Sequence, residues 1–84
     1  MPTPTILIYG ADWCGDCRRT RRFLTEHDIP FDWINIEKDQ QGEQLVLKIN
    51  KGMRSIPTLI FQDGSILVEP TVAQLARKLD ISLF

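Results

Sequence analysis

The chain has 84 residues, of which 43% are hydrophobic and 25% charged, and its formal net charge is -1. This length suits one small domain, and we expect residues 1–84 to form it. The near-neutral charge gives no reason to expect nucleic acid or an anionic membrane as a partner. Residues 1–4 lack the basic start of a signal peptide, and the apolar stretch after them is too short to span a membrane. We therefore expect a cytoplasmic protein.

The first half of the chain predicts a strand, a helix and a second strand. Residues 6–9 are apolar without alternation, which is typical of a central strand. Residues 18–26 contain no proline or glycine, so we predict a helix over residues 14–27. Its inner face is predicted to carry Cys17, Thr20, Phe23, Leu24 and His27. Residues 31–36 then predict a strand parallel to the first.

The second half predicts a helix, a β-hairpin and a last helix. The helix should begin near Asp39, a good N-cap, and end near Gly52, a candidate for a left-handed conformation. Strands over residues 58–61 and 66–68 flank Asp63-Gly64, which is a strong hairpin signal. Thr71 is expected to cap the last helix. The predicted inner faces are Leu45, Val46 and Ile49 in one helix, and Val72, Leu75, Ala76 and Leu79 in the other.

Both cysteines lie in one short motif, Cys14-Gly15-Asp16-Cys17. Two thiols at this spacing can form a disulfide when a helical turn brings their Cβ atoms to roughly 4 Å. We expect Cys14 at or just before the helix N-terminus, where free backbone N–H groups favour a thiolate. Cys17 should lie one turn further in and be more buried. This division predicts that an exposed Cys14 attacks a disulfide and that Cys17 resolves the resulting mixed disulfide.

The motif allows three other interpretations. A zinc site needs further ligands, and His27 is the one other candidate, so we expect no metal. A structural disulfide closing so short a loop would remove little chain entropy. A pure interaction module would leave a thiol at a helix start unexplained. Redox chemistry is therefore the favoured interpretation.

The chain resembles the glutaredoxin class of the thioredoxin fold over nearly its whole length. The resemblance rests on residues 13–17 after a first strand, on residues 55–58 before a third strand, and on a hairpin that leads into a final helix. Residues 50–54 and 63–65 followed by Pro70 resemble the mycoredoxin-like proteins in particular. The resemblance implies an α/β thioredoxin fold, in which three helices flank a four-stranded mixed sheet. It also implies a thiol-disulfide oxidoreductase with Cys14 as nucleophile and Cys17 as resolving thiol.

The same resemblance implies a cis peptide bond between Ile56 and Pro57, opposite the cysteine pair. General frequencies favour a trans bond, in which case Pro57 merely starts an edge-like strand. A cis bond would turn the Ile56 backbone N–H and C=O toward Cys14, where a bound substrate could pair with them as an added strand.

Several side chains beside the thiols allow more than one role. Trp13 either forms one wall of a substrate groove or packs as a partly buried aromatic ring. Gly15 leaves the sulfur approachable, whereas Asp16 stabilises the helix start but opposes a thiolate nearby. Four arginines follow, and they either guide anionic partners or are simply solvated helix surface: Arg18, Arg19, Arg21 and Arg22.

The family resemblance also bears on the thiol that the protein uses. In glutaredoxins a Gly-Gly and a polar cap residue hold the glutamyl end of glutathione, and Glu69-Pro70-Thr71 stand in their place. Proline lacks an N–H donor and Glu69 would repel a carboxylate, although Thr71 remains a candidate substrate contact. We therefore expect mycothiol more than glutathione as co-substrate, or direct reduction by a flavoprotein reductase, and no bound cofactor.

The expected partners are oxidised or thiol-modified proteins, and the expected state is a monomer. Two other activities stay open: an iron-sulfur cluster carrier that shares a cluster between two subunits, and an electron donor to a reductase such as ribonucleotide reductase.

Overall fold

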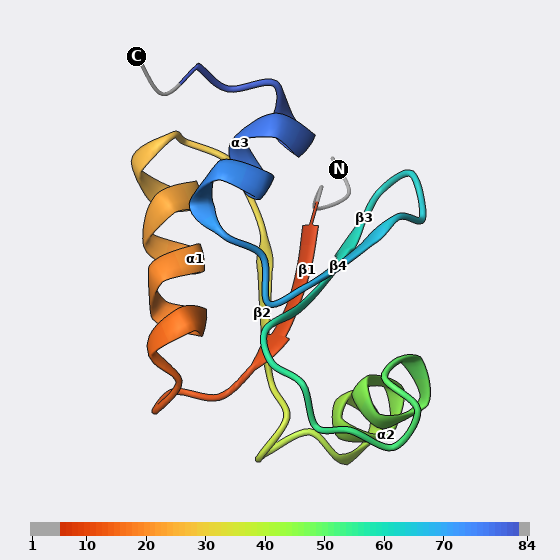
Figure 1. Ribbon diagram of the computed structural model, residues 1–84. Helices are drawn as coiled ribbons and strands as arrows, with labels where there is room; N and C mark the ends of the chain where they lie inside the picture. Colours follow the sequence, from red (N-terminus) through yellow and green to blue (C-terminus); the bar gives the residue numbers. More distant parts are fainter. Residues whose placement is uncertain (1–5, 83–84) are drawn as a thin grey trace.

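The computed structural model describes residues 6–82 (Figure 1). The strands are β1 (Ile6–Gly10), β2 (Asp32–Asn35), β3 (Thr58–Phe61) and β4 (Ile66–Val68), and the helices are α1 (Gly15–Glu26), α2 (Gln40–Ile49) and α3 (Val72–Leu79). Their order, β1-α1-β2-α2-β3-β4-α3, confirms the predicted one, with boundaries that differ by one residue or so. Within residues 6–82 no helix is long and apolar enough to cross a membrane.

The four strands form one mixed sheet in the order β2-β1-β3-β4. Strand β1 runs parallel to β2, with Ile8 opposite Trp33, and antiparallel to β3, with Ile8 opposite Leu59. Strand β4 pairs antiparallel with β3 and places Leu67 opposite Leu59. The central position of β1 agrees with its uninterrupted apolar sequence, because a central strand is buried on both faces.

The helices cover both faces of this sheet: α1 and α3 lie on one side and α2 on the other (Figure 1). Successive residues of β1 consequently contribute to two separate apolar clusters. The larger cluster, beneath α1 and α3, consists of Ile6, Ile8, Phe23, Leu24, Leu59, Phe61, Leu75 and Ala76. The smaller one, beneath α2, consists of Tyr9, Ile36 and Val46. The sheet thus divides the core into two layers.

Helices α2 and α3 begin where their local sequence predicts. Helix α2 begins at the N-cap Asp39, whose Oδ1 accepts the Gly42 N–H at 2.9 Å. Helix α3 begins at Thr71, which forms a capping box with Gln74. Gly52, after α2, has a φ angle of 89°, in the left-handed region predicted for it.

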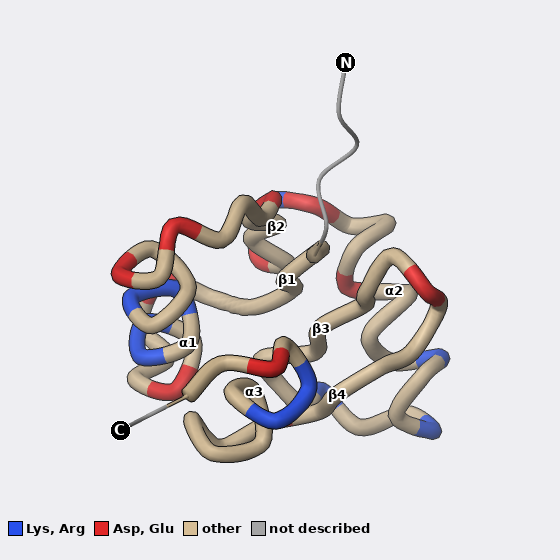
Figure 2. The backbone as a smooth tube through the Cα atoms, turned by 90° about the horizontal axis from the view of Figure 1, so that it is seen from above, with Lys and Arg blue, Asp and Glu red and all other residues tan. Residues whose placement is uncertain are grey.

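His27 departs from the predicted inner face of α1. The buried residues of this helix are Cys17, Thr20, Phe23 and Leu24, whereas His27 is the exposed C-cap, with its ring centroid 4.4 Å from that of Phe23. Figure 2 shows basic residues on α1. Three of them, Arg18, Arg19 and Arg22, are exposed.

Candidate active site

Cys14 occupies the N-cap position of α1, directly after the turn that leaves β1. Its Sγ accepts the backbone N–H of Cys17 at 3.1 Å, so a cysteine takes the capping role that serine or aspartate usually has. The N–H of Cys14 donates in turn to the Ala11 carbonyl oxygen at 3.2 Å. The sulfur therefore lies where the free N–H groups of the first helical turn point, as predicted from the sequence.

The two cysteines are free thiols with different access to solvent. Cys17 is 0% exposed, as predicted, but Cys14 is only 8% exposed and not the open side chain that the sequence suggested. The reason is that its sulfur turns inward to accept the Cys17 N–H. Burial, and secondly the hydrogen bond to Cys14, raise the pKa of the Cys17 thiol to about 12. Among residues 6–82 no cluster of three or more metal-ligating side chains is present.

The Ile56–Pro57 peptide bond is cis, so the alternative of a trans bond at an edge-like strand is wrong. The Ile56 carbonyl oxygen faces Cys14, at 4.0 Å from its Sγ. Hydrogen bonds hold this segment on both sides. Thr58 Oγ1 donates to the Ser55 carbonyl at 2.7 Å, and the Glu69 N–H donates to the Pro57 carbonyl at 2.8 Å.

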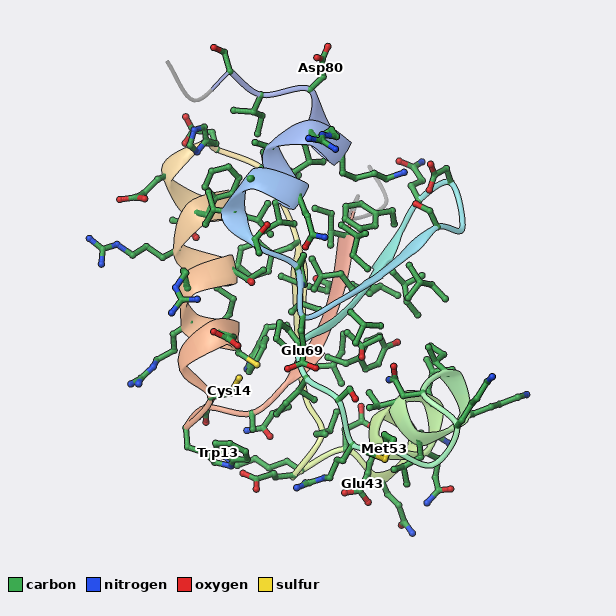
Figure 3. The ribbon with its side chains drawn as sticks, viewed as in Figure 1. Trp13, Cys14, Glu43, Met53, Glu69 and Asp80 are labelled. Carbon is green, nitrogen blue, oxygen red and sulfur yellow. The ribbon has the colours of Figure 1, made fainter. Side chains whose placement is uncertain are left out.

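A groove of about 520 Å³ opens between the start of α1 and the segment that precedes β3. Figure 3 shows Trp13 and Cys14 at one side of it, Met53 at the other, and Glu69 beside Cys14. The lining residues are Trp13, Cys14, Gly15, Asp16, Met53, Arg54, Ser55, Ile56 and Glu69. The structure thus brings together most of the residues that the sequence placed at the site.

Trp13 is 62% exposed, so it forms a wall of the groove and does not pack as a partly buried ring. A Cβ atom on Gly15 would have no neighbour within 4 Å, which leaves the approach to Cys14 open on that side. Pro57 and Thr71 do not line the groove. Pro57 is buried behind Ile56, and the Thr71 side chain and N–H both serve the capping box with Gln74. A substrate contact of Thr71 stays a prediction.

Sequence reasoning missed Met53, which is 65% exposed on the groove. A single exposed methionine in a loop has no periodic pattern, and its only signal was its place within the run 50–54. Its neighbour Arg54 also lines the groove. The Arg54 guanidinium is 3.0 Å from Glu43 and 3.9 Å from Glu37, and these ion pairs tie the loop to α2 and to the segment after β2.

The charged residues of the groove differ in whether an ion pair neutralises their charge. Asp16 forms an ion pair with Arg19 at 2.8 Å, and Arg54 is paired as described above. Glu69 has no ion-pair partner within residues 6–82, and its φ angle of 48° lies in the left-handed region that glycine prefers. Glu69 is therefore the uncompensated charge on the wall of the groove.

Comparison with known proteins agrees with this site. Residues 6–66 match the sequence model of the glutaredoxin family. A protein of Mycobacterium tuberculosis strain H37Rv that is named as a glutaredoxin is 37% identical over 79 residues, which cover 94% of each chain. Mycoredoxin 1 of Corynebacterium glutamicum is 29% identical over 75 residues, which cover 89% of this chain and 92% of that protein. The chain belongs to the glutaredoxin family and is a disulfide oxidoreductase of the glutaredoxin and mycoredoxin type.

Solved structures share the fold. The glutaredoxin of Archaeoglobus fulgidus superimposes with a TM-score of 0.73 at 23% identity, over 92% of this chain and 87% of that one. A thioredoxin-like protein superimposes with a TM-score of 0.74 at 21% identity, over 86% of this chain and 96% of that one.

Proposed function

We propose that the chain reduces protein disulfides or mixed disulfides, with Cys14 as nucleophile and Cys17 as resolving thiol. The observation that carries this proposal is the position of Cys14, which caps α1, accepts the Cys17 N–H and borders the groove. The Cys14 thiolate attacks one sulfur of the substrate and releases the other as a thiol. Cys17 then attacks Cys14 Sγ, so that the enzyme disulfide forms and the substrate leaves reduced.

The groove supplies the surroundings for this exchange. An extended substrate segment beside Cys14 would meet the Ile56 carbonyl oxygen, which already faces that sulfur. Such pairing adds the substrate as a further strand and leaves recognition to the groove walls. Trp13 and Met53, both exposed there, offer apolar contact on the two sides of the thiol.

We propose mycothiol as the co-substrate, with glutathione a weaker one. Glu69 supports this choice because its carboxylate lies on the groove wall and would repel the carboxylates of glutathione. Pro70, which follows it, has no N–H to donate to such a group. Similarity to mycoredoxin 1 also favours mycothiol. A flavoprotein reductase remains the other candidate source of electrons.

The test is to oxidise the purified protein and to follow its reduction by mycothiol, glutathione and flavoprotein reductases in parallel. The proposal expects reduction, fastest with mycothiol or a reductase. Cys14→Ser should abolish reduction of insulin disulfides, whereas Cys17→Ser should trap mixed disulfides that mass spectrometry detects. An active Cys14→Ser variant would refute the mechanism. Visible absorption from a cluster in protein purified without oxygen would point to iron-sulfur transfer instead.

The proposed setting is a reducing compartment, the cytoplasm, because a catalytic dithiol must be returned to its thiol form after each cycle. We further propose that residues 1–84 act as one domain and as a monomer. Both apolar clusters of residues 6–82 are built around the same sheet, which supports a single folding unit.

A further inference from the structure

Arg21 differs from the other arginines of α1. Its Nε is the one buried polar side-chain atom of residues 6–82 that has no hydrogen-bond partner. Arg19 and Arg22 form ion pairs with Asp16 and Glu26, but Arg21 forms none within the described chain. Burying part of a charged group without a partner is unfavourable, so the position of Arg21 requires an explanation.

The guanidinium of Arg21 is held against an aromatic ring. Its Cζ lies 3.9 Å from the centroid of the Trp33 ring, which is a close cation–π contact. The Trp33 ring in turn adjoins Cys17, because a Cβ on Gly10 would overlap both that ring and Cys17 Sγ. Arg21 also follows Cys17 by four residues, which puts both side chains on the same side of α1.

We propose that Arg21 is a positioning residue for the second step, in which it stabilises the thiolate that forms on Cys17. In this step the Cys17 thiol loses its proton and attacks Cys14 Sγ. The Cys14–Cys17 bond forms, the bond from Cys14 to the substrate sulfur breaks, and the departing thiolate takes up a proton. Negative charge therefore passes through a buried sulfur, and a cation beside it lowers the barrier.

Two ionisable groups of the described chain, Cys14 and Arg21, shift the pKa of the Cys17 thiol. Burial, and after it the hydrogen bond to Cys14, raise the pKa of the Cys17 thiol, whereas a backbone hydrogen bond involving Ala11 and, to a smaller extent, the Arg21 charge lower it. Once Cys14 is in a mixed disulfide it carries no charge. Within the described chain, Arg21 is then the one charged group that contributes to the pKa of Cys17.

Because this role rests on the proposed function of Cys17, the test must separate the two steps. Reduced protein is mixed with an equimolar amount of dithiobis(nitrobenzoate), and release of the coloured thiol is followed by stopped flow. The first phase reports attack by Cys14, and a second, concentration-independent phase reports resolution by Cys17. We expect Arg21→Gln to slow the second phase about tenfold near neutral pH and to shift its pH profile upward, with the first phase unchanged.

Two variants serve as controls. Arg21→Lys keeps the charge and should hold the second phase within about threefold of the native rate. Arg18→Gln removes an exposed arginine of the same helix and should leave both phases unchanged. An unshifted pH profile in Arg21→Gln, equal slowing in Arg21→Lys, or equal slowing in Arg18→Gln would overturn the role of Arg21. Absence of a second phase from the native protein would instead refute the resolving role of Cys17, and this inference with it.

Discussion

The Cys17 backbone N–H donates to Cys14 Sγ over 3.1 Å, so the residue that we propose as the resolving thiol also supports the sulfur that we propose as the nucleophile. The donor is a main-chain group and survives replacement of the Cys17 side chain. The two side chains differ in access, because Cys14 is 8% exposed and borders the groove while Cys17 is 0% exposed.

Brief alkylation of the reduced protein with iodoacetamide at neutral pH should therefore label Cys14 first. Access decides the order, and the raised pKa of the Cys17 thiol acts in the same direction, since the thiolate is the reactive form. Peptide mass spectrometry over a time course gives the two rates. A fully denatured sample, in which both cysteines are open, is the control. Faster labelling of Cys17 in the native protein would contradict the assignment of roles.

A methyl group should destabilise the protein at Gly10 but have little effect at Gly15. A Cβ on Gly10 would overlap Cys17 Sγ and the Trp33 ring, so Gly10→Ala should lower the free energy of unfolding by about 1–3 kcal/mol. Gly15→Ala places its Cβ in open space and should change that free energy by less than about 0.5 kcal/mol. Urea denaturation of the reduced proteins measures both. Equal stability of the two variants would show that Cys17 and Trp33 do not pack against Gly10 in this way.

The reduced protein should lose stability at alkaline pH through Cys17. Burial and the hydrogen bond to Cys14 raise the pKa of this thiol from 9.0 to about 12, so the folded state binds its proton more tightly than the unfolded state. The corresponding stability is fully present below about pH 9 and is lost as the pH rises toward 12. The free energy of unfolding should thus fall more steeply above about pH 9 than in Cys17→Ala.

Tyr9 requires a control in this experiment. Burial and the charge of Asp39 raise the pKa of its hydroxyl as well. Tyr9 therefore also makes the free energy of unfolding fall as the pH rises. That fall is present in both native protein and Cys17→Ala, and the difference between the two curves isolates the thiol. Urea midpoints measured under a reductant at several pH values provide the curves. Parallel curves would mean that Cys17 titrates alike in the folded and unfolded states.

Much of this fold follows from local sequence signals. The apolar run of β1 predicted a central strand, and Asp39 and Thr71 predicted the starts of α2 and α3, because N-caps depend on adjacent residues. The helix predicted over residues 14–27 likewise placed Cys14 at a helix start. The cis bond before Pro57 is different, since it was expected from family resemblance and not from the sequence pattern.

Features that depend on distant segments were not predictable in the same way. The exposed Met53 wall arises where the loop before β3 lies opposite α1, and no periodicity marks such a residue. The low exposure of Cys14 depends on which way its sulfur turns. The contact of Arg21 with Trp33 joins α1 to β2, which are distant in the sequence. The sequence alone therefore did not distinguish Arg21 from the other three arginines of α1.

Glu69 should weaken reaction with glutathione through its charge. It lines the groove with Cys14 and has no ion-pair partner within residues 6–82, so a carboxylate bound nearby would meet an uncompensated negative charge. Repulsion between such partly exposed charges is worth about 1 kcal/mol, or roughly fivefold in a rate. Glu69→Gln should therefore react several-fold faster with a glutathionylated peptide, and the gain should shrink in high salt because salt screens exposed charges.

Glu69→Gly and Glu26→Gln complete this experiment. Glycine removes the charge and also suits the φ angle of 48°, so Glu69→Gly should combine the faster reaction with a free energy of unfolding higher by about 1 kcal/mol. Glu26→Gln makes the same change in net charge at the other end of α1, where Glu26 pairs with Arg22, and should leave the rate unchanged. Stopped-flow rates at two salt concentrations decide the matter. An equal gain in rate for Glu26→Gln would mean that overall net charge governs the choice of thiol. A gain for Glu69→Gln that does not depend on salt would mean that the shape of the side chain, and not its charge, governs this choice.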